Sequence, residues 1–216
     1  MSSNSILREL SRTQLKSNWA NCVLVFLIQF IIVAFLNKLG NSKNLGVLAS
    51  LIGLISIFVY SPLAFGVRKY YLDLARHNVK DIPSMFEYFT NWKKFLIPTG
   101  LYFWNFLWIC IWGLLLTIPG IIKAISYSMS YFIMIDNLDI GIRKALKISI
   151  KMTKGHNLKI FALFLSFSGY AVLSVLTLGL GFLFVIPYFL TSFSNLYIEL
   201  KKLSLESGIC TAEDFA

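Results

Sequence analysis

The chain has 216 residues, of which 57% are hydrophobic and only 14% are charged, and its formal net charge is +10. Soluble domains carry about 25% charged residues, so this composition excludes an ordinary soluble enzyme and a disordered chain. A basic soluble chain would suggest nucleic acid as a partner, but the cytoplasmic loops of membrane proteins also collect Lys and Arg. We therefore expect an all-α, polytopic membrane protein that binds no nucleic acid.

The chain begins with a basic segment, residues 1–18, which we expect to form a cytoplasmic helix. An apolar segment follows directly. Its length is close to the roughly 20 residues that one membrane crossing needs. No small-residue cleavage pattern comes after Leu36. This segment is therefore predicted to remain as a membrane anchor rather than to be removed as a signal peptide.

Two longer apolar blocks later in the chain are each divided by a turn-prone sequence. Residues 117–120 include Pro and Gly, and residues 177–181 include two glycines, which suit the positive φ of a tight bend. The result is a membrane domain over 19–203, with six transmembrane helices in three hairpins, followed by a cytoplasmic tail over 204–216. The predicted spans are about 19–36, 45–67, 95–117, 121–135, 158–176 and 182–198.

The positions of the basic residues predict the orientation of these spans. Of the 20 Lys and Arg residues, all except Lys38, Lys43 and Lys123 fall on one side of the six-span topology. Because Lys and Arg concentrate in cytoplasmic loops, both termini are predicted to be cytoplasmic, in a multi-pass protein of the cell membrane.

Two segments on the cytoplasmic side have the periodicity of amphipathic helices, 84–92 and 139–155. In the second, apolar side chains recur on one face, and Asp139 is placed to cap the start. We expect this helix to lie on the inner leaflet with its apolar face in the lipid. The alternative is a helix packed on the protein with its basic face in water. The candidate contacts for anionic lipid headgroups are Arg143, Lys147, Lys151 and Lys154.

Polar residues inside the predicted spans form a second candidate site. Lys123 is the only charged residue at membrane depth, and it either extends to the surface or attracts an anion in a polar cavity. The other members are Ser126, Tyr127, Ser130 and Tyr131 in the fourth span and Thr191, Ser194 and Asn195 in the sixth. Because the two sets follow Pro119 and Pro187, we expect them to face each other. They would either form hydrogen bonds between helices or line a polar path.

Residues with the spacing of known catalytic or metal sites are lacking. The nucleophile elbow, the zinc helix and the phosphate-binding loop are all absent from the sequence. The three cysteines form no CxxC pair, and His77 and His156 have no carboxylate or cysteine at ligand spacing. We therefore expect no enzyme activity, no cofactor and no metal.

The second half of the chain carries a series of short motifs that resembles a known family. The series is Ser126-Tyr-Ser-Met-Ser, Asp136-Asn-Leu-Asp-Ile, Gly155-His-Asn, Leu176-Thr-Leu-Gly-Leu-Gly and Ile186-Pro-Tyr, and near the N-terminus Leu15-Lys-Ser-Asn-Trp fits the family's opening. It is similar to the bacterial integral membrane proteins grouped as domain of unknown function 975. The resemblance implies a six-span helical protein of the cytoplasmic membrane and assigns no catalytic residue. One departure is Leu138, where relatives often have proline.

These observations favour a non-enzymatic envelope or accessory protein that acts through lipid or protein contacts, with protection against membrane-active peptides as one form. Its partners would be a bilayer with anionic headgroups and either another membrane protein or a second copy of the chain. The alternative is a small-solute transporter or channel with a polar path between spans four and six. The transporter alternative is suggested by a pattern that recurs three times along the sequence, a basic helix followed by a proline-containing hairpin. A membrane enzyme acting on lipid is the least favoured, because the chain shows no acid–base pair.

Overall fold

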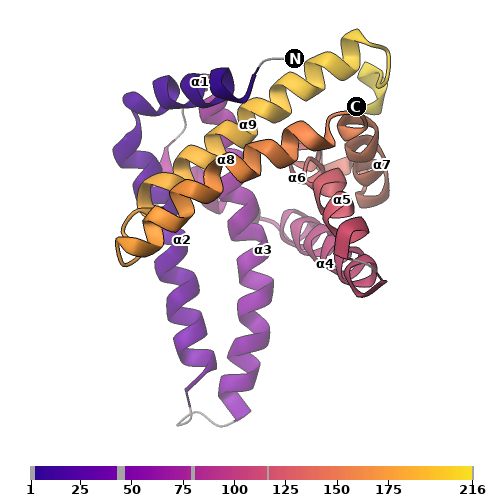
Figure 1. Ribbon diagram of the computed structural model, residues 1–216. Coiled ribbons are helices and arrows are strands. Elements are labelled where there is room, and N and C mark those ends of the chain that lie inside the picture. The colour runs from indigo at the N-terminus through magenta and orange to yellow at the C-terminus, as the bar shows by residue number, and fades with distance from the viewer. Residues whose placement is uncertain (1–2, 43–46, 79–80, 116, 216) are drawn as a thin grey trace.

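The computed structural model describes residues 3–42, 47–78, 81–115 and 117–215 (Figure 1). This part of the chain is mostly helical and contains no strand, which confirms the all-α prediction. Three short 3-10 helices, labelled η, lie between or after the α-helices. The elements are α1 (Asn4–Lys16), α2 (Trp19–Gly40), α3 (Val47–Ala75), η2 (Ile82–Phe89), α4 (Trp92–Leu115), α5 (Thr117–Tyr127), α6 (Ser130–Asp136), η3 (Leu138–Ile140), α7 (Ile142–Thr153), α8 (Asn157–Leu176), α9 (Phe182–Glu206) and η4 (Ala212–Asp214).

Five of the described helices are long and apolar enough to cross a membrane, namely α2, α3, α4, α8 and α9. The predicted turn at 177–181 separates α8 from α9, and Gly179 in it has a φ of +89°. Helix α3 extends about two turns beyond the predicted end at residue 67. Neither Gly nor Pro follows that position within the helix, so nothing in the sequence stops it there.

The span predicted for 121–135 does not form one helix. Helix α5 ends at Tyr127 and α6 begins at Ser130, and each is too short to cross a membrane alone. The Ser128 hydroxyl donates to the carbonyl of Ile125 (2.7 Å), and the Ser130 hydroxyl donates to that of Tyr127 (2.6 Å). Such side-chain bonds compete with the regular hydrogen bonds of a helix, and here they coincide with its division.

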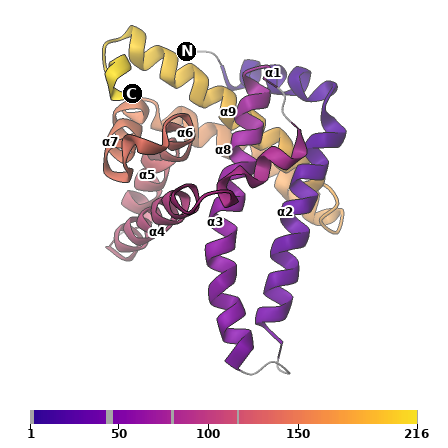
Figure 2. The same ribbon diagram turned by 180° about the vertical axis from the view of Figure 1, so that it is seen from behind.

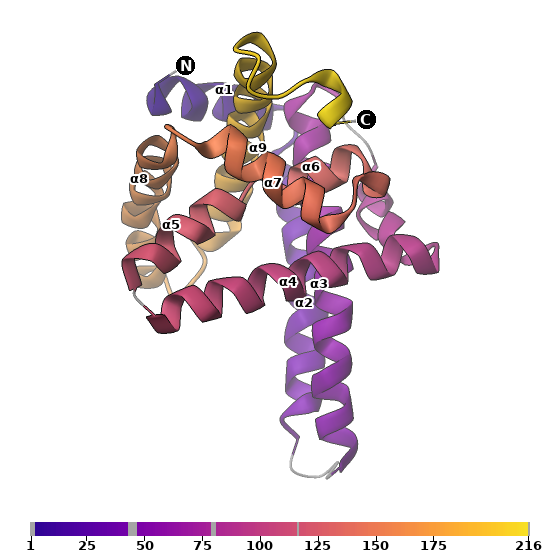
Figure 3. The same ribbon diagram turned by 90° about the vertical axis from the view of Figure 1, so that its right-hand side faces the viewer.

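The long helices cross one another instead of running parallel. Helices α2 and α3 lie side by side as a hairpin that projects away from the rest of the molecule (Figures 1 and 2). Helix α4 lies across α3, and α5 and α7 lie on the same side of α4 (Figure 3). The α8–α9 hairpin crosses the α2–α3 hairpin (Figure 1). Both ends of the described chain lie at the end of the molecule opposite to the tip of the α2–α3 hairpin.

Helix α9 is the centre of the core. Half of its apolar stretch (50%) is buried inside the protein, compared with 11% of that in α2. Phe193, Leu196 and Leu200 of α9 belong to one buried cluster with side chains from α6, α7 and α8. The burial of apolar surface, which contributes about 25 cal/mol per Å², holds α6, α7 and α8 on α9.

The segment η2 packs directly on α3 (Figure 2). Gly66 of α3 permits this close approach, because a Cβ atom there would overlap the backbone carbonyl of Met85 in η2. Glu87 then pairs with Lys69 of α3 and with Lys94 of α4, the latter at 2.9 Å. The hydrogen bond from Lys69 is the largest of the contributions that lower the pKa of Glu87 to about 2. Glu87 is therefore charged at neutral pH and links three elements.

Replacing Gly66 by alanine is expected to destabilise the protein, because the added methyl group must push η2 away from α3. Overpacking of this kind costs about 1–3 kcal/mol. The thermal unfolding midpoint in detergent, followed by circular dichroism, should therefore fall. The matched control is Gly53→Ala in the same helix, where a Cβ atom would have no neighbour within 4 Å. Equal midpoints for the two variants would contradict the close approach.

Candidate functional site

The polar residues predicted to face each other lie on α5, α6 and α9, and most of them bond within their own helix. The hydroxyls of Ser126, Thr191 and Ser194 each donate to the carbonyl four residues earlier. Ser130 accepts a hydrogen bond from Asn105 Nδ2 of α4 (3.2 Å), which joins α6 to α4. These residues therefore contribute to helix geometry and packing.

Aromatic rings surround two cations of this region. Lys123 Nζ lies 5.2 Å from the ring centre of Trp112 and 5.9 Å from that of Tyr127. The guanidinium of Arg68 lies 4.6 Å from the ring centre of Tyr131. A cation over an aromatic face gains about 0.5–2 kcal/mol, so the rings stabilise both charges.

Asn195 of α9 faces α1 and not the predicted fourth span. Its amide donates to Ser11 Oγ (2.9 Å) and to Gln14 Oε1 (2.7 Å), and all three side chains are buried. Gln14 Nε2 donates back to Asn195 Oδ1 (3.3 Å) and to the carbonyl of Ala75 at the end of α3 (3.0 Å). The expected contact between Asn195 and the serines of α5 and α6 is therefore wrong, because the N-terminal helix satisfies its amide.

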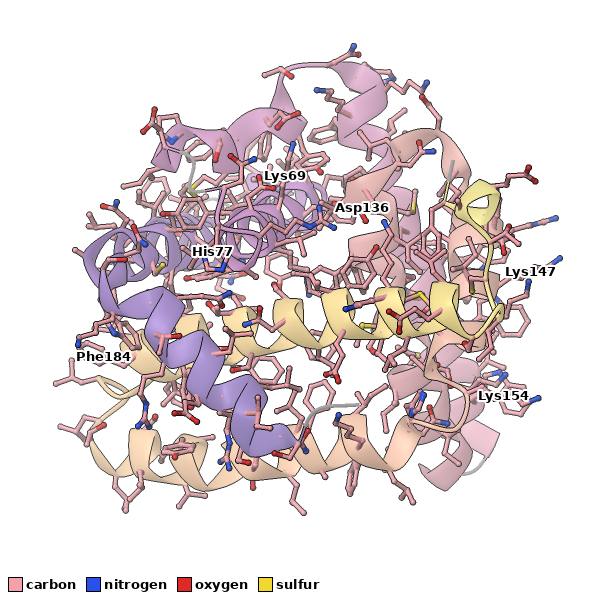
Figure 4. The ribbon with its side chains drawn as sticks, turned by 90° about the horizontal axis from the view of Figure 1, so that it is seen from above. Lys69, His77, Asp136, Lys147, Lys154 and Phe184 are labelled. Carbon is pink, nitrogen blue, oxygen red and sulfur yellow. The ribbon has the colours of Figure 1, made fainter. Side chains whose placement is uncertain are left out.

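Helices α6 and α9 do meet, but through aromatic rings and one carboxylate. Phe132 stacks on Tyr197 with ring centres 5.1 Å apart. Asp136, at the end of α6, accepts hydrogen bonds from Tyr197 Oη (2.8 Å), Lys201 Nζ (2.5 Å) and Arg76 Nη2 (3.0 Å). Its side chain is only 10% exposed, and Figure 4 shows it away from the edge of the molecule. We call these four polar residues, Asp136, Arg76, Tyr197 and Lys201, the Asp136 cluster.

The C-terminal segment lies against this cluster. Lys201 Nζ is 4.6 Å from the ring centre of Phe215, and Asn137 Nδ2 donates to the carbonyl of Phe215 (3.4 Å). Cys210 is also buried. The residues that were expected to form a cytoplasmic tail, 204–216, are thus part of the folded structure as far as residue 215.

Sequence reasoning does not find the Asp136 cluster. Tyr197 and Arg76 are 61 and 60 residues from Asp136 along the chain, so no local pattern joins them. The one signal is an acidic residue directly after an apolar span, where a charge needs a partner.

Helix α7 is amphipathic, as predicted, but its apolar face packs on the protein. Ala145, Ile148 and Met152 are buried in the core cluster around α9. The expected insertion of this face into lipid is therefore wrong, and the alternative of a helix packed on the protein fits the contacts. Figure 4 shows Lys147 and Lys154 pointing outward at the edge of the molecule.

Two further cations of α7, Arg143 and Lys151, have neighbours within the protein. The guanidinium of Arg143 lies 5.6 Å from the ring centre of Trp104, and Lys151 Nζ lies 4.0 Å from a carboxylate oxygen of Asp214. Both are still exposed, as are Lys147 and Lys154. We call Arg143, Lys147, Lys151 and Lys154 the α7 basic face.

The predicted capping of α7 by Asp139 is wrong. Gly141, with a φ of +79°, occupies the N-cap position, and no side chain caps the helix there. Asp139 instead pairs with Lys93 (2.5 Å), and the Asn137 side chain accepts from the Asp139 backbone N–H (2.9 Å). The positive φ at Gly141 turns the chain so that Asp139 lies outside the first helical turn.

Among the described residues, no group of three or more His, Cys, Asp or Glu side chains is placed to hold a metal ion. Cys22 and Cys210 are buried and Cys110 is exposed, each as a free thiol.

Replacing Asp136 by asparagine is expected to lower the free energy of unfolding by about 3 kcal/mol, because it leaves the Lys201 and Arg76 charges without their carboxylate. Denaturant titration of the detergent-solubilised protein measures the change. The control is Asp139→Asn, because the Asp139 and Lys93 side chains are 70% and 67% exposed. An exposed pair contributes less than about 1 kcal/mol. If Asp136→Asn lowered the free energy of unfolding no more than Asp139→Asn does, the structural role of the cluster would be contradicted.

The comparisons with known proteins agree with the resemblance in the second half of the chain. The family model described as "Protein of unknown function (DUF975)" matches residues 101–204, from within α4 to near the end of α9. No curated protein and no solved structure matches the chain. The match covers slightly less than half of the chain and supports its membership of the DUF975 family.

Proposed function

We propose that this chain is an integral protein of the cell membrane that crosses the bilayer six times, as three hairpins, with both termini in the cytoplasm. The support is the large amount of apolar side-chain surface outside the core. Phe35 is 61% exposed, Val172 is 62% exposed and Leu176 is 73% exposed. Such surfaces on long apolar helices are suited to lipid and costly in water.

The sixth crossing in this proposal is made by α5 and α6 together. They cover residues 117–136, about the length that a crossing requires. Five crossings would place the termini on opposite sides of the membrane, whereas both ends of the described chain lie at the end of the molecule opposite to the tip of the α2–α3 hairpin (Figure 1). Irregular backbone within a membrane is tolerated where protein buries it, and Ser130, where α6 begins after α5, is fully buried.

Cysteine labelling tests the orientation. In a Cys110→Ser background, which removes the exposed thiol, Lys38→Cys should react with a membrane-impermeant maleimide added to intact cells. Lys147→Cys should react only after permeabilisation, because it lies on the cytoplasmic side. A membrane-permeant maleimide should label both and serves as the control. Labelling of Lys147→Cys from outside would contradict the topology.

We propose further that the protein acts without catalysis, through contacts of the α7 basic face with anionic lipid headgroups. The observation that carries this is the exposure of the four cations on a helix whose other face is fixed to the core. Anionic lipid attracts such a segment by about 1 kcal/mol for each cation near the surface. Protection against membrane-active peptides is one form of this role, since cationic peptides need the same anionic headgroups.

The alternative of a polar path between spans four and six has less support. Lys123 lies against rings of α4 and α5, whereas Asn195 is bonded to α1. A path would have to pass through groups that already have separate partners.

A spin label at Lys147→Cys tests the headgroup contact in liposomes. A nickel-chelating lipid should relax this label more strongly than one at Lys202→Cys, and the effect should grow with the fraction of phosphatidylglycerol. Lys202 is the control because its side chain is 75% exposed, on a different helix. Equal relaxation at both positions, independent of anionic lipid, would place the α7 basic face in water and contradict the proposal.

A further inference from the structure

A groove lies between α1 and the α8–α9 hairpin, with one wall residue from α2. Its volume is about 730 Å³, within the range of about 300–1,000 Å³ that small-molecule sites occupy. One wall is the basic side of α1, and the other is aromatic. The residues that carry the argument are Arg8, Arg12 and Lys16 of α1, Trp19 of α2, Tyr170 of α8 and Tyr188 of α9.

The three cations lie four residues apart, so they share one face of α1. Like charges at this spacing disfavour a helix. Among the described residues, none of the three forms an ion pair with a carboxylate, although cations elsewhere do so, such as Lys201 with Asp136. Glu9 is the one acidic residue among those that line the groove. The groove therefore has a net positive charge that the protein itself does not neutralise.

The aromatic wall leads from these cations to an apolar surface. The guanidinium of Arg12 is 5.9 Å from the ring centre of Tyr188. The ring of Trp19 is 5.9 Å from that of Phe184, which is 57% exposed and lies at the edge of the molecule beside α1 (Figure 4). Tyr and Trp are the residues that membrane proteins place at the level of lipid headgroups.

We propose that this groove binds one anionic glycerophospholipid, with its phosphate on Arg8, Arg12 and Lys16. The glycerol would lie against Tyr170 and Tyr188, and the acyl chains would run over the exposed apolar side of the α8–α9 hairpin. A free phosphate shares the charge but leaves the rings and the apolar surface uncovered. The order of cations, rings and apolar surface therefore favours the lipid.

This inference rests on the proposed membrane location, but it concerns a different surface from the α7 basic face. That face would contact many lipids at the bilayer surface. The groove would hold one molecule, since rings and cations converge on it from four helices.

Calorimetric titration of the purified full-length protein in a nonionic detergent tests the proposal. The probes are dihexanoyl phosphatidylglycerol, dihexanoyl phosphatidylcholine, glycerol phosphate and inorganic phosphate. We expect phosphatidylglycerol to bind at least about tenfold more tightly than the other three, because only it combines net negative charge with acyl chains. The affinity should fall as salt is raised to 0.5 M, since about 4 Å of screening length then remains.

Two variants that remove the same number of charges locate the site. Arg8→Gln/Arg12→Gln/Lys16→Gln should lose at least about tenfold in affinity, whereas Arg143→Gln/Lys147→Gln/Lys154→Gln should change it by less than about twofold. The single variants Arg12→Gln and Lys16→Gln guard against misfolding, because both side chains are exposed, and each should weaken binding measurably.

Equal losses in the two triple variants would overturn the groove as the site, because charge alone would then explain binding. Equal affinity for inorganic phosphate and for phosphatidylglycerol would overturn the lipid as occupant. Absence of binding to the unaltered protein would overturn the whole inference. None of these results alters the maleimide labelling, so failure of the groove is distinguishable from failure of the proposed topology.

Discussion

The position of Asp136 is the constraint on which the interior depends. A carboxylate that is 10% exposed needs close partners, because removing an ion from water costs several kcal/mol. Arg76 after α3 and Lys201 and Tyr197 of α9 supply them. The end of α6 is thereby held to two other helices. Helix α7 begins only six residues after Asp136, so the same charge pairs also restrict where the α7 basic face lies.

The α2–α3 hairpin has an additional kind of contact. Only 11% of the apolar stretch of α2 is buried, although α3 contributes large buried side chains such as Phe65, Tyr70 and Tyr71. Small residues bring its helices together, and a Cβ atom at Gly40 would lie 3.2 Å from Gly53 Cα. Helix pairs in lipid associate through such close backbone approach, since apolar side chains gain little there by leaving the solvent.

Apolar length and turn residues predict the helices well where one helix spans one segment, as in α8 and α9 with the turn at 177–181 between them. They fail at 121–135, where two serine hydroxyls bond to backbone carbonyls and the helix divides. Periodicity identifies the two faces of α7, but it does not tell whether lipid or protein covers the apolar one. The contacts of Asp136 and Asn195 join residues 60 or more positions apart, and no local pattern contains that information.

The side-chain amides of Gln14 and Asn195 donate hydrogen bonds to each other in both directions. Each amide presents a donor on one side and an acceptor on the other, and both are matched. If α1 slid along α9 by one turn, two desolvated amides would lose their partners together. Helix α1 therefore has a single register on α9. The amide pair thereby also sets the spacing between the cations of α1 and the tyrosine rings of the α8–α9 hairpin, although it contacts neither group.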